Sequence, residues 1–327
     1  MNILIIGCGN IGSRHIESIL KSKKKINIHV VDNSIKNLTN AKKKFKKFNN
    51  NKINLIFKNN LIDFKIIFDY LIIATNSDVR KDVYIKCLDT NKFKNVIFEK
   101  IAFTNIDEYL YVIKISQKNK INTYVNFPRR SYPFYNKIKK LLKKNKHITI
   151  NVFGNNWGLA SNSFHFLDLF CFLTDTNKLN HLVSKLDENI LKSKRKNFIE
   201  FTGSIEIENN KNDILNIKDH LLKSKFHSDN NFIITIYNDN KIYIINEKNK
   251  IYYEVNKDKL LKVNKLKISI PLQSELTLKI LEQHHRNKNM TLPKLKDCLN
   301  THKVLLNIFS NKLFKSNLRI RRHIPIT

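Results

Sequence analysis

The stretch NILIIGCGNIG, residues 2–12, places a short apolar run directly before three glycines with G-x-G-x-x-G spacing. Gly7, Gly9 and Gly12 are half of the six glycines in 327 residues, so a glycine-rich composition does not explain the spacing. Between a strand and a helix, such glycines allow a tight turn and let backbone amides approach a pyrophosphate. Asp32 ends the next apolar run, where a carboxylate can bind an adenosine ribose and favour NAD over NADP. A solvated turn is the alternative for Asp32.

Short apolar runs alternate with helical patterns up to residue 126. Strands are expected at 2–6, 26–31, 53–57, 70–74, 95–98 and 121–126, and helices at 11–21, 33–48, 80–88 and 106–119. This order is typical of an α/β fold with a doubly wound parallel sheet, the Rossmann fold. We therefore assign residues 1–126 to a dinucleotide-binding domain.

The pattern changes after Pro128. A basic helix at 132–144, a strand at 148–153 and an apolar helix at 162–173 are followed by alternating segments that predict strands at 198–208, 231–237, 241–246 and 251–255. Helices are expected at 272–285 and 295–311. Residues 127–327 therefore predict an α+β domain with a largely antiparallel, open sheet.

The chain is strongly basic, with 60 Lys and Arg against 27 Asp and Glu and a formal net charge of +33. Such a charge can attract nucleic acid or an anionic membrane. The excess is mainly Lys, however, and Arg, which makes bidentate contacts with bases and phosphates, is scarce. We therefore expect no dedicated nucleic-acid partner. A nucleic-acid binder stays open as the last of three hypotheses, and the other two are given at the end of this subsection.

Cys8, Cys87, Cys171 and Cys298 lack the paired spacing of a zinc site or a disulfide framework, so we expect buried thiols. The sequence starts without the pattern of a secretory signal, and no apolar run approaches the roughly 20 residues of a membrane span. His284 and His285 have no carboxylate at a metal-ligand spacing. We expect a cytoplasmic protein with no metal site and no membrane partner.

Four further clusters follow the predicted strands. They are IATN at 73–76, FEK at 98–100, VNFPRR at 125–130 and GNNWG with HFLD within 154–168. In this order and spacing they resemble the Gfo/Idh/MocA oxidoreductases, NAD(P)-dependent enzymes that act mostly on sugars, inositols and sugar derivatives. The resemblance covers about the first 175 residues. It implies a cofactor, NAD with NADP as the alternative, held by Gly7, Gly9, Asn10, Ile11, Gly12, Asp32, Ala74, Thr75, Asn76, Glu99, Lys100 and Asn126.

The resemblance also implies two catalytic residues. Lys100 matches the lysine that contacts both the nicotinamide ribose and the reacting hydroxyl, where an ammonium stabilises a developing alkoxide. His165 matches the general acid/base, a role that histidine suits near neutral pH; a histidine packed in an apolar helix is the alternative. Two departures stand out: Ile101 replaces the family's proline, and Ser161 replaces an aspartate four residues before His165. Because Ser161 carries no charge, either the substrate differs or activity is reduced.

Four residues are expected to bind substrate: Arg130, Trp157, Ser161 and Asn162. Arg130 can pair with a substrate carboxylate or phosphate, or lie on a solvated surface. Trp157, the single tryptophan, can stack on a sugar face or fill a gap in the second domain's core.

The sequence thus predicts an oxidoreductase that transfers a hydride between NAD(P) and a hydroxyl or carbonyl group. Its substrate would be a sugar, sugar nucleotide or related polyol, and a weaker likeness points to surface-polysaccharide biosynthesis. A dinucleotide-binding accessory or sensor protein with little or no catalysis is the alternative, and Ser161 favours it. The resemblance further implies that residues 127–327 bind substrate and form a dimer or tetramer interface.

Overall fold

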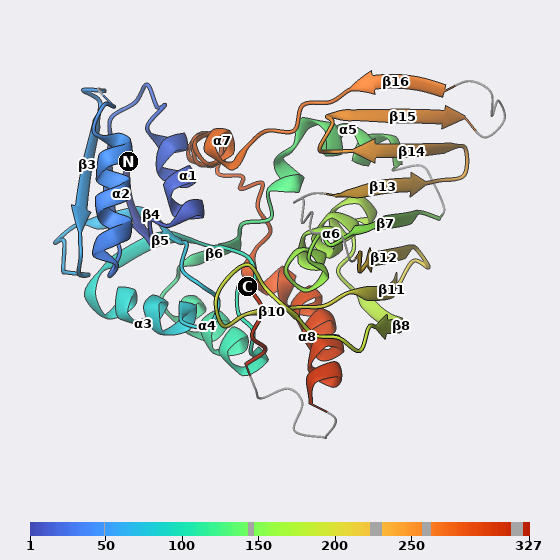
Figure 1. Cartoon of the computed structure of the whole chain (residues 1–327). Coiled ribbons are helices and arrows are strands. Elements are labelled where there is room, and N and C mark those ends of the chain that lie inside the picture. Colours follow the sequence, from blue (N-terminus) through green and yellow to red (C-terminus); the bar gives the residue numbers. More distant parts are fainter. Residues whose placement is uncertain (49, 143–146, 223–230, 257–262, 315–322) are drawn as a thin grey trace. The chain divides into compact units, whose positions relative to one another are not determined.

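The computed structural model describes residues 1–48, 50–142, 147–222, 231–256, 263–314 and 323–327. They form two compact units, one of residues 1–131 with 271–297 and one of residues 132–270 with 298–327 (Figure 1). The first crossing between units lies close to the boundary expected after residue 126. The first unit also contains helix α7 (Gln273–Asn287), which returns to it from the late part of the chain.

A six-stranded sheet in the order β3-β2-β1-β4-β5-β6 forms the first unit, and all its strand pairs are parallel. The strands are β1 (Asn2–Ile6), β2 (Ile26–Val31), β3 (Ile53–Lys58), β4 (Ile67–Ile73), β5 (Lys92–Phe98) and β6 (Asn122–Val125). The connecting helices are α1 (Asn10–Ile19), α2 (Ile35–Phe45), α3 (Arg80–Thr90) and α4 (Ile106–Lys118). The predicted doubly wound fold is confirmed.

Right-handed connections place α1 and α2 on one face of this sheet and α3 and α4 on the other. With both faces covered, its central strands are apolar along their length, and Leu4, Ile72 and Val96 are fully buried. The strand order reverses between β1 and β4. Doubly wound sheets bind ligands at the carboxyl ends of the strands beside such a reversal.

Helix α7 packs beside α1 in the first unit. Ser18 Oγ of α1 accepts a hydrogen bond from the backbone N–H of Leu278 (3.0 Å), and Lys21 Nζ donates to the carbonyl oxygen of Ser274 (2.8 Å). A segment that lies between the two parts of the second unit in the sequence therefore becomes part of the first unit.

The second unit is built on an eight-stranded sheet in the order β16-β15-β14-β13-β7-β12-β11-β8. Its strands are β7 (Thr149–Asn155), β8 (Leu179–Leu186), β11 (Gly203–Asn209), β12 (Ile214–His220), β13 (Phe232–Tyr237), β14 (Lys241–Asn246), β15 (Ile251–Asn256) and β16 (Val263–Lys267). Only β7 and β12 pair in parallel among these described strands, so the largely antiparallel sheet is confirmed.

The strand expected at 198–208 is split in two. Its first part is β10 (Ile199–Glu200), which pairs with β9 (Leu191–Lys192) in a small ladder of its own, and its second part is β11. Phe201 and Thr202 separate the two parts and are both buried. This break leaves Glu200 outside the large sheet.

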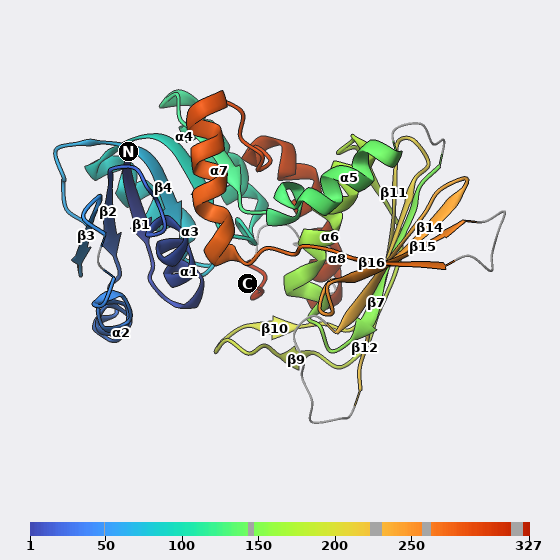
Figure 2. The same cartoon turned by 90° about the horizontal axis from the view of Figure 1, so that it is seen from above.

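Helices α5 (Pro133–Leu142), α6 (Leu159–Thr174) and α8 (Leu299–Leu313) cover one face of the large sheet (Figure 2). The expected end of the first of these helices at residue 144 lies outside the described residues. The opposite face presents Phe153, Ile233, Ile244 and Tyr253 and carries none of the described helices. As expected, all four cysteines are buried free thiols. None of the helices described is long and apolar enough to span a bilayer.

Candidate functional site

The glycine loop after β1 is shaped by close backbone contacts. A Cβ on Gly7, whose φ is +92°, would lie 3.0 Å from the carbonyl oxygen of Ala74, and one on Gly12 would lie 1.9 Å from the carbonyl oxygen of Gly7. A Cβ on Gly9 would meet no described atom within 4 Å. Gly7 and Gly12 are therefore required for folding of the loop, whereas Gly9 leaves open space at the start of α1.

This open space suits a negatively charged group. Gly9 is the N-cap of α1, and no described side chain caps its first turn. The amides and dipole of an uncapped helix start attract phosphate. A cavity of about 580 Å³ adjoins the loop, and its lining includes Asn10, Arg14 and Lys44. The loop thus fits the pyrophosphate of a dinucleotide.

Asp32 is buried and connects β2 to the glycine loop. Its Oδ2 accepts hydrogen bonds from the backbone N–H of Cys8 (2.8 Å) and from Asn37 Nδ2 (3.2 Å), and its Oδ1 accepts from the N–H of Ser34 (2.8 Å). Burial, followed by the negative charge of Asp32, raises the pKa of the Cys8 thiol to about 12, so that thiol stays neutral. The solvated-turn alternative for Asp32 is therefore wrong. Ribose binding by Asp32 stays a prediction.

The other predicted cofactor residues meet at one edge of the sheet. Backbone hydrogen bonds run from Ala74 N to Ile6 O (2.8 Å), from Glu99 N to Ile73 O (3.1 Å) and from Asn126 N to Phe98 O (2.8 Å). These bonds continue the parallel ladder one step past β4, β5 and β6. The structure therefore brings the segments that begin at Ala74, Glu99 and Asn126 to the same carboxyl edge as the glycine loop.

Thr75 adds an unsatisfied polar group at this edge. Its Oγ1 is buried and has no hydrogen-bond partner among the described residues. Buried polar atoms are normally paired, so an unpaired hydroxyl beside the glycine loop fits a position that a ligand completes. Asn76, the next residue, is exposed.

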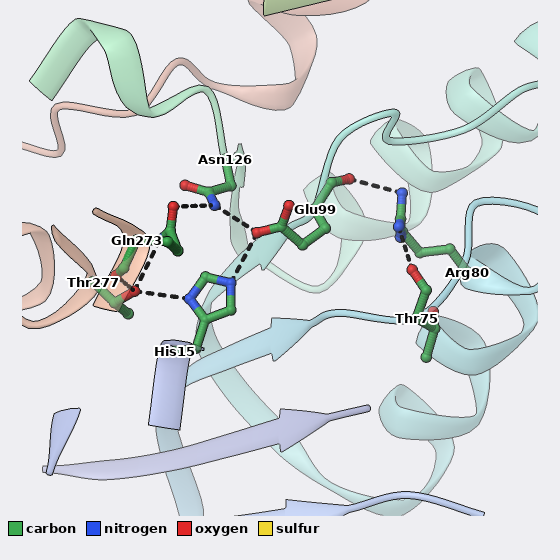
Figure 3. Close-up of polar contacts among 7 residues, drawn as sticks. All are labelled: His15, Thr75, Arg80, Glu99, Asn126, Gln273 and Thr277. Atoms are coloured by element: carbon green, nitrogen blue, oxygen red, sulfur yellow. Dashed lines mark hydrogen bonds and ion pairs between the residues drawn. The ribbon is translucent and has the colours of Figure 1, made fainter. Parts of the chain in front are cut away.

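Glu99 belongs to a closed ring of five polar side chains (Figure 3). Its Oε1 lies 2.8 Å from His15 Nε2 and accepts a hydrogen bond from Asn126 Nδ2 at 2.5 Å. His15 Nδ1 lies 2.8 Å from Thr277 Oγ1. Gln273 completes the ring, because its Nε2 donates to Thr277 Oγ1 (2.9 Å) and its Oε1 accepts from Asn126 Nδ2 (3.2 Å). The ring joins α1, the ends of β5 and β6, and α7.

The ring keeps Glu99 ionised although it is buried. Burial alone would raise the pKa of this carboxyl, but the hydrogen bonds from His15 and Asn126 and the charge of Arg80 hold it below its usual range. An ionised carboxylate only accepts hydrogen bonds, so His15 Nε2 carries a proton. Glu99 is therefore a fixed negative group immediately before Lys100, and the peptide bond from Lys100 to Ile101 is cis.

Arg80 connects the ends of β4 and β5. Its side chain is buried, and its guanidinium donates to the carbonyl oxygens of Thr75, Glu99 (2.7 Å), Ile101 and Ala102 (3.1 Å). Figure 3 shows the bonds to Thr75 and Glu99. A planar guanidinium with five N–H groups suits this task, which a lysine ammonium could not perform in the same geometry.

Sequence reasoning missed Arg80, His15, Gln273 and Thr277 as site residues. His15 lies within the helix predicted at 11–21 without any spacing that marks it as a site residue, and the one available signal for Arg80 is an arginine in a chain dominated by lysine.

Three of the predicted residues, Ser161, Asn162 and His165, lie on α6 in the second unit. His165 lies one turn after Ser161 and is partly exposed, whereas Phe164 and Phe166 beside it are buried. Asn162 Nδ2 donates to the carbonyl oxygen of Trp157 (2.6 Å). Residues three and four apart lie on the same side of a helix, so α6 places Ser161, Asn162 and His165 on one side. Catalysis by His165 and Lys100 stays a prediction.

Trp157 requires a correction. The indole is only 3% exposed, its edges meet Phe166 and Phe232, and its Nε1 donates to the carbonyl oxygen of Lys218 (3.2 Å). Stacking on a sugar needs an exposed ring face, so the core-filling alternative is the one that this unit adopts.

Arg130 does not join the glycine-loop cavity. It lies in a short 3-10 helix (Pro128–Ser131) and lines another cavity, of about 690 Å³, that extends to Tyr70 and Asn95 in β4 and β5. The two cavities have no lining residue in common. The structure therefore separates Arg130 from the glycine loop, and its role in substrate binding stays a prediction.

Comparisons with known proteins agree with this geometry. A solved oxidoreductase from Agrobacterium radiobacter, in complex with NAD+, L-tartaric acid and magnesium, superposes with a TM-score of 0.73 at 12% identity, covering 97% of both chains. UDP-N-acetylglucosamine 3-dehydrogenase from Acidithiobacillus ferrooxidans gives a TM-score of 0.69 at 9% identity, covering 94% of this chain and 96% of that one. At these identities the likeness concerns the fold alone.

A sequence relative and a family model add to this. A putative precorrin-2 dehydrogenase from Methanocaldococcus jannaschii is 27% identical over 132 residues, which are 36% of this chain and 62% of that protein. This chain thus spans less than two thirds of that relative's length. The family model for oxidoreductases with an NAD-binding Rossmann fold matches residues 1–127. Residues 1–127 are thus similar to the Gfo/Idh/MocA family of oxidoreductases with an NAD-binding Rossmann fold.

Proposed function

We propose that the protein transfers a hydride between NAD(P) and a hydroxyl or carbonyl carbon of a sugar, sugar nucleotide or related polyol. The observation that carries the proposal is the Glu99 ring, which fixes the backbone before Lys100 at the sheet edge that holds the glycine loop. Bound nicotinamide accepts or donates the hydride. Lys100 stabilises the alkoxide at the reacting oxygen, and His165 exchanges the proton at that oxygen.

The proposed substrate class rests on the side chains of the second unit. Ser161, Asn162 and His165 share one side of α6 and offer hydroxyl, amide and imidazole groups, the types that recognise hydroxyls. The fold likeness to UDP-N-acetylglucosamine 3-dehydrogenase supports sugar nucleotides as the first compounds to try. We place the reaction in surface-polysaccharide biosynthesis.

The test is NAD-linked turnover by the purified protein. Sugar nucleotides, sugars and inositols are offered with NAD+ or NADP+, and reduced cofactor is followed by its absorbance. Lys100→Ala should abolish turnover and leave the cofactor dissociation constant within about threefold of wild type, since the glycine loop is untouched. Lys94→Ala is the matched control, because Lys94 lies on β5, the strand that leads to Lys100, and is exposed and paired with Asp69. Full turnover by Lys100→Ala contradicts the assignment.

Ser161 favours one alternative, an accessory or sensor protein that binds the dinucleotide without turnover. It stands at a position where related enzymes have an aspartate, and it carries no charge. Saturable NAD binding with no product from any member of the panel would favour this alternative over the enzyme.

We further propose a cytoplasmic homo-oligomer without a dedicated nucleic-acid partner. The uncovered face of the second unit's sheet, with Phe153, Ile244 and Tyr253, supports a dimer or tetramer interface. Light scattering of Phe153→Glu against wild type tests this: a shift toward monomer is expected, and an unchanged mass contradicts it. Tight DNA or RNA binding at physiological salt would contradict the absence of a nucleic-acid partner.

A further inference from the structure

Two carboxylates from different strands meet the start of α6. Asp219, on β12, accepts hydrogen bonds from three successive backbone N–H groups, with Oδ1 bonded to Trp157 N (3.3 Å) and Oδ2 to Gly158 N (3.0 Å) and Leu159 N (3.2 Å). It is 1% exposed, and these bonds occupy both of its oxygens. Asp219 therefore performs the capping task that the N-cap residue, Gly158, has no side chain to perform.

Glu200, on β10, is placed differently. Its Oε2 accepts hydrogen bonds from the backbone N–H groups of Ala160 (2.9 Å) and Ser161 (3.3 Å), which holds the carboxylate against the first turn of α6. The side chain is partly exposed, unlike that of Asp219. Oε2 thus anchors the Glu200 carboxylate to α6. The position of Oε1 determines which other groups the carboxylate can contact.

The second oxygen lies over the bare α-carbon of Gly158. A Cβ built on this glycine would lie 3.2 Å from Glu200 Oε1, 2.9 Å from Ser161 Oγ and 3.3 Å from Asn162 Nδ2. The φ of Gly158 is +85°, which also favours glycine. A carboxylate oxygen, a hydroxyl and an amide therefore converge where the chain has no side chain of its own. The hydroxyl and the amide belong to two of the predicted substrate-binding residues.

We infer that Glu200 supplies the substrate site with the negative charge that Ser161 lacks, by accepting a hydrogen bond from a substrate hydroxyl beside Ser161 and Asn162. This inference rests on the proposed function. It narrows the substrate class, because a carboxylate attracts hydroxyl donors and repels a carboxylate or phosphate placed at the same position. The part of the substrate that lies next to α6 is therefore a neutral polyol, and any anionic group lies elsewhere.

The electrostatics of this region agree with a structural role for Asp219 and a substrate contact for Glu200. Burial raises the pKa of Asp219 to about 7, the three backbone N–H groups lower it only in part, and the charge of Glu200 raises it further. Asp219 is therefore partly protonated near neutral pH. Its role is structural, whereas Glu200 Oε1 lies beside the polar groups at the start of α6.

The test compares Glu200→Gln with wild type. Glutamine keeps the shape and a carbonyl oxygen for the α6 amides but loses the charge. Because a hydrogen bond to a charged group is worth more than a neutral one, KM for the best polyol substrate should rise about 10- to 100-fold. The NAD dissociation constant and the melting temperature should stay unchanged. Glu206→Gln, the same substitution at a partly exposed position of the next strand, is the matched control and should leave KM unchanged.

A rescue variant separates a missing charge from a disturbed fold. Ser161→Asp added to Glu200→Gln returns a carboxylate to the same turn of α6 and should recover at least a tenth of the wild-type kcat/KM. If Glu200→Gln retains wild-type KM and kcat while Lys100→Ala is inactive, the inference about Glu200 is wrong and the proposed function stands.

If wild type shows no turnover, polyol binding tests the inference about Glu200 instead. Calorimetric titration of the same polyols into the NADH-loaded protein then compares wild type with Glu200→Gln. Weaker binding by Glu200→Gln supports the Glu200 contact although the proposed enzyme activity has failed. Equal binding, or no binding by either protein, overturns the inference.

Discussion

Alanine substitutions at Gly12 and Gly9 should separate folding of the glycine loop from binding of the cofactor. At Gly12, the new methyl carbon would lie 1.9 Å from the carbonyl oxygen and 2.8 Å from the carbonyl carbon of Gly7. Both are backbone atoms of the same loop, so the clash is relieved only if the loop moves. At Gly9, the new methyl carbon meets no described atom within 4 Å, and the φ of −63° is open to alanine.

The expected magnitudes differ accordingly. Overpacking of a tight site costs about 1–3 kcal/mol, and alanine regains up to about 1 kcal/mol as the better helix former. Gly12→Ala should therefore lower the free energy of unfolding by about 1–2 kcal/mol, or the melting temperature by roughly 2–8 °C for a domain of this size. Gly9→Ala should leave the free energy of unfolding unchanged or raise it by up to about 1 kcal/mol.

Cofactor binding should be weakened by Gly9→Ala, the variant whose stability is expected to be unaffected or improved. The methyl group of Gly9→Ala occupies the space through which the amides of α1 reach the pyrophosphate, so NAD affinity should fall at least about tenfold, or about 1.4 kcal/mol. Denaturant unfolding gives the stability, and titration calorimetry with NADH gives the affinity. Wild-type NADH affinity for Gly9→Ala, or equal loss of stability in both variants, would refute this reading of the loop.

Three further predictions concern other parts of the two units. Thr277→Val or His15→Ala removes a partner from the buried Glu99 ring. Each variant should lower the free energy of unfolding by about 1–3 kcal/mol in denaturant titrations. An unchanged free energy of unfolding for His15→Ala would show that the ring is dispensable. Because the folded pKa of Asp219 is raised from 3.8 to about 7, its contribution to stability is fully present below about pH 4 and is lost as the pH rises to about 7. Unfolding measured from pH 4 to 8 should therefore show a decline in wild type relative to Asp219→Asn, and parallel curves would contradict the raised pKa. Arg80→Lys should weaken NADH binding and lower the melting temperature, since an ammonium cannot bridge the loops after β4 and β5; unchanged values for both would show that the guanidinium contacts are not needed.

Local sequence patterns predicted most of the structure of the first unit. The glycine spacing and Asp32 lie within one β-α-β unit, so their geometry depends on turn and helix-start rules that act over a few residues. The strands predicted at 2–6 and 26–31 match β1 and β2 at both ends. Apolar runs buried on both faces are a strong signal, and parallel strands bring their carboxyl ends together without further information.

The second unit was less predictable because its sheet depends on pairing between distant segments. The single run at 198–208 hides a break at Phe201, which sends β10 to β9 and β11 to the large sheet. Periodicity gives no sign of this break, since both parts alternate. The same local signal at Trp157 left stacking and packing equally open, and only the position of Phe166 and Phe232 decided between them.

The sequence by itself determined the cofactor domain: a strand, a glycine loop and a helix start, repeated strand and helix signals, and strand-end residues that share one edge. Tertiary structure decided which groups support that edge. Thr277 closes the polar ring around Glu99 from 178 positions further along the chain, and Glu200 reaches the head of α6 from a separate strand. Neither contact is marked by a periodic pattern or a fixed spacing in the sequence. Side chains from different elements meet only after the apolar faces of those elements have packed. Buried polar partners follow from that packing and cannot be read in advance of it.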